Sequence, residues 1–261
     1  TIADAVPLVG ENRVLARFGL EGLAQPVNPG LHALLALALP QRPAAIRSAD
    51  VAYRIAPRLN AAGRMGAADR VVEMFFAPAA EAAALAQSLE ALNEERKALC
   101  AAILAEIEAQ AEPASLGPVR VHAGAGWHRG VLGIVASRMV ERSGQAALVI
   151  ALEPDASGRM QAHGSGRAPA GMHLHRLLQG CGELFTRFGG HAQAVGFSLP
   201  AEQLPALRAY LAAADAASLP PAAEAAAFDC ELAELTPQVC QELRRLEPFG
   251  VRPVRDRADR L

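Results

Sequence analysis

Between residues 117 and 216, short apolar segments with strand character alternate with amphipathic helical segments. The strand-like segments are VRVHAGAG (119–126), QAALVIALEP (145–154) and HAQAVGFSLP (191–200). The helical segments are GVLGIVASRMVER (130–142), GMHLHRLLQGCGELF (171–185) and AEQLPALRAYLAAAD (201–215). Strands that alternate with helices are typical of a sheet flanked by helices. The sequence therefore predicts an α/β domain over this region.

A longer helical pattern precedes this domain, from about residue 79 to residue 112. Its leucines and isoleucines recur at spacings of three, four or seven, which places them on one helix face. At ~1.5 Å per residue such a helix would run roughly 45–50 Å, long enough to connect two domains. Shorter helices are predicted upstream in GENRVLARFGLEGL and NPGLHALLALALP, and a strand and a helix in 228–250.

The composition of the chain sets only broad limits on its function. The net charge is −2, so no global basic field indicates nucleic acid, although a basic groove can exist in a neutral chain. The four cysteines are far apart and form no C-x-x-C pair, which favours a reducing cytoplasm over a disulfide framework. No run of 18 or more apolar residues predicts a membrane span.

Two polar motifs are candidates for phosphate binding. In HGSGRA, Ser165 and Arg167 flank a glycine, so on an extended segment both side chains leave the same face. A hydroxyl beside a guanidinium suits a phosphate, while the alternative is a hairpin tip with a solvated arginine. In APRLNAAGRMG, Asn60 and Arg64 would share a helix face and Arg58 lies just before them. The alternative for these three is an exposed charged surface.

In the segment RFGGHAQAVGF, glycines and alanines surround a histidine. Gly189 and Gly190 precede His191, and small residues follow it. This pattern favours a backbone held close to a ligand, with His191 as a functional donor, over an ordinary turn. The pair His173 and His175 lies in a helical pattern, where residues two apart diverge, so a metal site is not expected there.

The turn HAGAGWHRGVLG (122–133) lies between a predicted strand and a predicted helix. Such a glycine-rich turn can bind the pyrophosphate of a dinucleotide. Trp127 and His128 occupy the positions where the backbone would approach that group. We therefore favour a structural turn beneath a substrate cleft.

Five segments, in order, resemble the RecJ-type single-stranded-DNA exonucleases of the DHH phosphoesterase superfamily. They are TIADAVPL…EN, APRLNAAGRMG, WHRGVLGIVASRM, GSGRA and FGGHAQAVGF. FGGHAQAVGF is similar to the signature of the DHHA1 domain, and RLNAAGR narrows the resemblance to the RecJ type. The resemblance implies a DHHA1 domain with a mixed sheet flanked by helices (117–216). A DHH-domain remnant (1–40) and a helical connector (41–116) would precede it, and a linker with the start of an oligonucleotide-binding fold (217–261) would follow.

The resemblance also implies an activity and a set of site residues. RecJ-type enzymes hydrolyse single-stranded DNA from the 5′ end with two Mn²⁺ or Mg²⁺ ions, in DNA repair and recombination. Ser165 and Arg167 resemble the pair that holds the 5′-phosphate, and His191, after Gly189 and Gly190, the histidine that reaches the scissile phosphate. Three connector residues resemble the lining of the DNA path: Arg58, Asn60 and Arg64. A single-strand-binding protein and a helicase are the implied partners.

The sequence departs from this pattern at both ends. It contains neither the D-H-H nor the D-x-D metal motif, and Asp4 matches only a residue beside a metal ligand. The chain alone is therefore expected to be inactive, as the substrate-binding half of an enzyme whose metal ligands lie in a missing N-terminal part. After LEPFG the tail VRPVRDRADRL matches nothing in the family, as a frameshift would explain. The alternatives are an oligoribonuclease or cyclic-dinucleotide phosphodiesterase, and a non-catalytic nucleic-acid-binding fragment.

Overall fold

The computed structural model describes residues 1–3, 6–110, 117–214 and 234–249. It divides into two compact units, one formed by residues 1–95 and 227–261 and the other by residues 96–226. The boundary falls within the long helix α6 (Ala79–Ala109), so the predicted helix of residues 79–112 is confirmed to within a few residues.

Helices make up the described part of the first unit. They are α1 (Gly10–Gly22), α2 (Pro29–Ala38), α3 (Ser48–Asp50), a π-helix (Val51–Ile55), α4 (Ala56–Arg64), α5 (Asp69–Phe76), the first part of α6, and α10 (Pro237–Arg244). Asn28 caps α2, because its side chain accepts a hydrogen bond from Leu31 N at 2.9 Å, as its place before a proline predicts. The core of this unit gathers apolar side chains of α2, α4, α5 and α6 around the fully buried Leu34, Leu35 and Met74.

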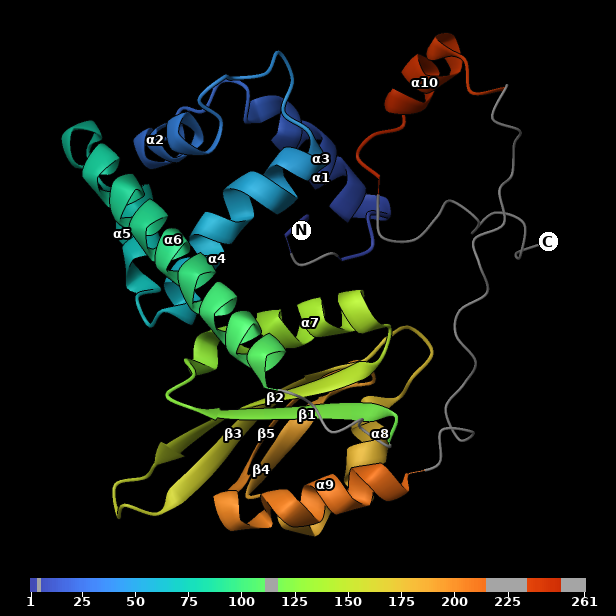
Figure 1. Cartoon of the computed structure of the whole chain (residues 1–261). Coiled ribbons are helices and arrows are strands. Elements are labelled where there is room, and N and C mark those ends of the chain that lie inside the picture. The colour runs from blue at the N-terminus through green and yellow to red at the C-terminus, as the bar shows by residue number, and fades with distance from the viewer. Residues whose placement is uncertain (4–5, 111–116, 215–233, 250–261) are drawn as a thin grey trace. The chain divides into compact units, whose positions relative to one another are not determined.

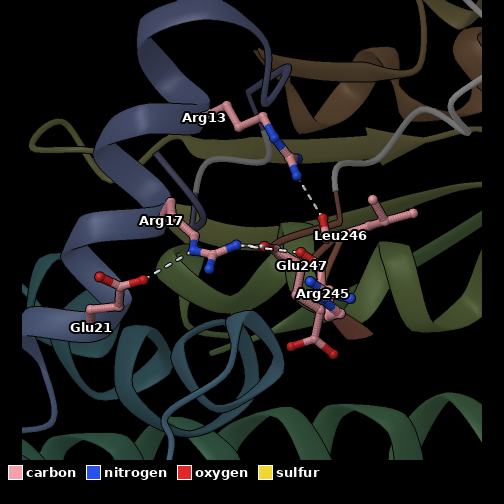
Figure 2. A network of polar contacts seen from close by, with 6 residues as sticks. All are labelled: Arg13, Arg17, Glu21, Arg245, Leu246 and Glu247. Atoms are coloured by element: carbon pink, nitrogen blue, oxygen red, sulfur yellow. Dashed lines mark hydrogen bonds and ion pairs between the residues drawn. The ribbon is translucent and has the colours of Figure 1, made fainter. Parts of the chain in front are cut away.

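Two arginines of α1 bind the chain end of α10 within the first unit (Figure 2). Arg13 donates to the carbonyl oxygen of Leu246 at 2.6 Å, and Arg17 to that of Glu247 at 3.4 Å. Arg17 is also ion-paired with Glu21 at 3.0 Å. Both acceptors lie in the segment that follows the C-cap residue Arg245 of α10, so the two guanidinium groups hold this segment against α1.

A five-stranded mixed sheet forms the centre of the second unit (Figure 1). Its strands are β1 (Val119–Ala125), β2 (Ala146–Pro154), β3 (Met160–Arg167), β4 (Arg187–His191) and β5 (Ala194–Pro200). The order is β1-β2-β3-β5-β4, with β1 and β2 parallel and the other pairs antiparallel. The α/β domain that the sequence predicts is therefore present, with the mixed sheet that the resemblance implies.

Helices flank both faces of this sheet (Figure 1). The crossover helix α7 (Leu132–Ser143) and the end of α6 cover one face, where they bury Ala147, Val149 and Ala151 of β2. Helices α8 (Leu174–Gln179) and α9 (Leu204–Ala213) cover the opposite face, over Leu148, Ile150 and further side chains of β3 and β5. Because β-strand side chains alternate, each strand contributes to both layers.

One predicted helix and one alternative need correction, and one predicted strand lies outside the described residues. GSGR belongs to the interior strand β3, so the hairpin-tip alternative is wrong, since the tip lies at residues 155–159. The helix expected over 171–185 is only α8 followed by a 3₁₀ turn (Gly182–Leu184). RFGGH, for which no element was predicted, forms the strand β4. The strand expected near residue 228 falls in a segment that the structure leaves undescribed. No helix of the described segments is long and apolar enough to span a membrane.

Candidate functional site

Strand β3 presents Ser165 and Arg167 on the sheet face against which α7 packs. Their register partners on β2 are Val149 and Ala147, which pack under α7. The β2–β3 hairpin helps to fix this register, because the Asp155 carboxylate accepts hydrogen bonds from the backbone N–H groups of Ser157 and Arg159, at 2.8 and 3.0 Å. These contacts, led by the hydroxyl of Ser157, also lower the pKa of Asp155. The expectation that both side chains of GSGR leave one face is therefore confirmed.

The side chains of Ser165 and Arg167 contact each other. Arg167 Nη1 donates to Ser165 Oγ at 3.2 Å and to the carbonyl oxygen of Gly166 at 2.8 Å. Both residues are only partly buried. A partly buried guanidinium that neighbouring oxygens hold in place is oriented in advance for an anionic ligand.

The first turn of α7 lies against this pair at Gly133. A Cβ atom at Gly133 would lie 2.9 Å from Arg167 Nη2 and 3.1 Å from Ser165 Oγ. The missing side chain therefore leaves the guanidinium and the hydroxyl room at the N-terminal end of a 12-residue helix, where the partial positive charge of the helix favours anions. Gly133 lies in the helix predicted over 130–142, but nothing local in the sequence indicates that it meets β3.

On strands β5 and β4 the same sheet face carries glycines, so the backbone there is not covered by side chains. Gly196 is paired with Ser165 across one ladder and with Gly189 across the next. Both glycines are exposed, and a Cβ atom at either would meet no heavy atom within 4 Å. The sheet is therefore open here, and a ligand could approach the backbone itself.

The last two residues of strand β4, Gly190 and His191, have different roles: His191 lies on the open face, and Gly190 allows an unusual backbone conformation. His191 lies in the same register row as Ala194 and Arg167, and its side chain is exposed. Gly190 has φ of +143°, and a Cβ atom there would overlap the carbonyl oxygen of Ala194. Gly189 and His191 thus share the open face with Ser165 and Arg167, whereas Gly190 is required by the backbone conformation.

His173 and His175, the two histidines of the H-x-H pair, have structural contacts. His173 caps α8 by accepting a hydrogen bond from Arg176 N at 3.2 Å. His175 stacks on Phe188 of β4 with ring centroids 4.8 Å apart. The stack supports the edge strand that carries Gly189 and His191.

The glycine-rich turn after β1 is structural, as its bulky residues suggest. Trp127 is buried, its ring occupies the space beside Gly124 that a side chain would fill, and its Nε1 donates to Glu106 at 2.7 Å. His128 accepts a hydrogen bond from Gly130 N at 3.1 Å and so starts the turn that leads into α7.

The connector residues lie on α4 in the first unit and are described within it. Arg58 is ion-paired with Glu90 of α6, with Nη2 and Oε1 3.0 Å apart, and its side chain is mostly buried. Asn60 and Arg64 are exposed on α4. Arg58 therefore joins two helices, and of the three candidates Asn60 and Arg64 are the ones presented to solvent.

The comparisons with known proteins agree with this architecture. Residues 116–214 match the DHHA1 domain family. The single-stranded-DNA-specific exonuclease RecJ of Bacillus subtilis is 35% identical over 258 residues, 96% of this chain and 32% of that protein. RecJ of Thermus thermophilus is 37% identical over 253 residues, 96% of this chain and 36% of that protein.

Solved structures lead to the same group. The crystal structure of Thermus thermophilus RecJ with Mg²⁺ has a TM-score of 0.82 at 36% identity, over 96% of this chain and 38% of that one. The structure of the same protein with Mn²⁺ has a TM-score of 0.83 at 35% identity, over 96% of this chain and 37% of that one. The chain spans about a third of the length of the curated relatives that it matches. Residues 116–214 thus carry a DHHA1 domain, and over the region that it spans the chain is similar to the RecJ exonucleases.

Proposed function

We propose that this chain binds the 5′ end of single-stranded DNA as part of a 5′→3′ exonuclease of DNA repair and recombination. The observation that supports this most is the shared open face of β3, β5 and β4. There the Ser165–Arg167 pair lies beside a floor formed by Gly189 and Gly196. The names of the relatives, single-stranded-DNA-specific exonucleases, favour DNA over short RNA or cyclic dinucleotides.

In this proposal Arg167 and Ser165 bind the terminal phosphate. A terminal phosphate carries more negative charge than an internal one, so a guanidinium and a helix N-terminus together favour a 5′-phosphorylated end. The strand would then cross the exposed glycines towards His191, about two strand spacings from Arg167, or roughly 9.6 Å. His191 would donate a hydrogen bond to the phosphodiester there.

The described residues do not fit the metal centre that the family implies. No group of three or more histidine, cysteine, aspartate or glutamate side chains among them could hold a metal ion. The related structures contain Mg²⁺ or Mn²⁺, and in the exonuclease such ions would activate water and stabilise charge on the phosphate. The role that we assign to this chain's own residues is to bind and orient the strand.

The proposal extends to the setting of the reaction. A helicase and a single-strand-binding protein would supply the unwound strand, in the cytoplasm. We assign residues 1–40 to a DHH domain, 41–116 to a helical connector and 117–216 to the DHHA1 domain. The oligonucleotide-binding fold expected over 217–261 falls largely outside the described residues.

The test is the affinity of the 261-residue chain for single-stranded oligothymidylate that differs only in its 5′ end. We expect the 5′-phosphorylated strand to bind about tenfold more tightly than the 5′-hydroxyl strand, a difference of about 1.4 kcal/mol. Arg167→Gln should remove most of that preference. Arg208→Gln is the matched control, since Arg208 is exposed on α9, which covers the opposite face. Equal affinity of the unmodified chain for both strands would refute the proposal, and tighter binding of short RNA would favour the oligoribonuclease alternative.

A further inference from the structure

A third row of polar side chains lies on the open face, beside the one formed by Ser165, Gly196 and Gly189. In this row His163 of β3 is paired with Ser198 of β5, and Ser198 with Arg187 of β4. This row and the row of Ser165, Gly196 and Gly189 are two residues apart along each strand, or about 6.7 Å. Since strand side chains alternate, all of these residues leave the same face of the sheet.

The three side chains of this row lie close to one another, with His163 and Ser198 partly buried and Arg187 exposed. His163 Nδ1 and Ser198 Oγ form a hydrogen bond of 2.9 Å. Burial lowers the pKa of His163, and the positive charges of Arg129 and Arg187 lower it further, against the opposing effect of Glu153. The imidazole is therefore neutral near pH 7, and both guanidinium groups lie near it.

Of the two arginines, Arg187 is the one available to a ligand. Arg129 is ion-paired with Glu153, with Nη2 and Oε2 2.6 Å apart. Arg187 is exposed, and its side chain has no hydrogen bond or ion pair with any residue in the described segments. An uncompensated guanidinium beside a hydroxyl and a neutral imidazole offers several donors and one net positive charge, which suits a phosphodiester.

We propose that Arg187, Ser198 and His163 form a second phosphate subsite, which binds an internal phosphate of the strand whose 5′-phosphate lies at Ser165 and Arg167. The inference rests on the proposed function and deepens it. The two rows are about 6.7 Å apart, which is close enough for phosphates of one extended strand to occupy both. The contacts are to phosphate and not to base edges, so this subsite adds affinity without sequence preference.

The subsite predicts how affinity depends on the number of phosphates in the ligand. A mononucleotide such as thymidine 5′-phosphate has only the terminal phosphate and should not reach Arg187. A 5′-phosphorylated oligothymidylate should occupy both subsites. Because each neutralised phosphate of a single strand releases about 0.7 counterion, loss of this contact should also reduce the salt dependence of oligonucleotide binding by about that amount.

The experiment compares Arg187→Gln with Arg208→Gln in the full chain. Binding of a labelled 5′-phosphorylated oligothymidylate is measured by fluorescence anisotropy over a range of salt concentrations, and thymidine 5′-phosphate is measured by competition. Arg187→Gln should weaken oligonucleotide binding about three- to tenfold and lower the salt slope, with mononucleotide binding unchanged. Arg208→Gln, which removes the same charge from α9, should change neither.

Three further results distinguish a failure of this inference from a failure of the proposed function. If Arg167→Gln weakens oligonucleotide binding but Arg187→Gln does not, the second subsite is refuted and the proposed function stands. If Arg187→Gln weakens mononucleotide binding to the same extent, Arg187 acts on the terminal phosphate and the second subsite is again refuted. If the unmodified chain does not bind the phosphorylated strand, the proposed function fails and this inference fails with it.

Discussion

Replacing Gly190 with alanine is expected to destabilise the second unit strongly, although the adjacent change Gly189→Ala should not. Gly190 has φ of +143°, a conformation that costs a residue with a side chain about 1–3 kcal/mol. Its Cβ atom would also overlap the carbonyl oxygen of Ala194 on β5, and such overpacking costs about 1–3 kcal/mol. The two costs together are about 2–6 kcal/mol.

Gly189 provides the matched control one position earlier on the same strand. A Cβ atom there meets no heavy atom within 4 Å, and its φ is not in the positive region. Exposed substitutions of this kind usually change the free energy of unfolding by less than about 0.5 kcal/mol. The added methyl group does, however, stand on the open face, so Gly189→Ala should weaken binding of single-stranded DNA.

Thermal unfolding followed by circular dichroism distinguishes the two variants. For a domain of about 100 residues, 1 kcal/mol shifts Tm by roughly 4–8 °C, so even the smallest sum for Gly190→Ala predicts a decrease of about 8 °C. Gly189→Ala should unfold within about 4 °C of the unmodified chain. Equal Tm values for Gly190→Ala and the unmodified chain would refute the strain argument, and a large decrease in Gly189→Ala would refute the view that this face is open.

Three further outcomes are expected. Gly133→Ala should leave stability unchanged or slightly raised, since alanine favours helix over glycine by about 1 kcal/mol. It should reduce the preference for a 5′-phosphate, because Arg167 and Ser165 must move to make room for the methyl group. An unchanged preference in the anisotropy assay would contradict this. Burial, reinforced by the charge of Glu183, raises the pKa of Cys181 to about 11, so iodoacetamide at pH 8 should label exposed Cys240 and spare Cys181 until urea is added. The lowered pKa of His163 means that the unfolded chain binds this proton more readily, so stability is full above about pH 6.5 and decreases below it. His163→Gln should lose less stability than the unmodified chain between pH 7.5 and 5.5 in urea titrations, and an equal loss would contradict the assignment.

The elements and residues that the sequence predicted correctly are those specified by local patterns. The Asn28–Pro29 start of α2, the periodic leucines of α6 and the apolar run of β2 each carry their own signal within a few residues. The shared face of Ser165 and Arg167 follows from period-two alternation alone. The same alternation reaches His163, so the first residue of the second subsite could have been found from the sequence.

The features that the sequence did not predict have non-local causes. Strand β4 contains two glycines, which have low strand propensity, and its pairing with β5 and the stack of His175 on Phe188 are what hold it extended. Gly133 meets Arg167 only because α7 crosses over the sheet. Arg58 is engaged by Glu90, 32 residues further along the chain, which no local pattern indicates.

The glycines of the segment HGSGR connect the site to the core beneath it. Gly164 and Gly166 point to the α8–α9 face, where a Cβ atom would overlap Phe197 in the first case and Leu148 in the second. A slip of one residue would bury Arg167 and expose these glycines, so the fit between glycine and large side chains opposes it. The functional residues and the glycines thus occupy alternate positions of one strand. The orientation of the phosphate-binding pair depends on apolar packing on the opposite side of the sheet.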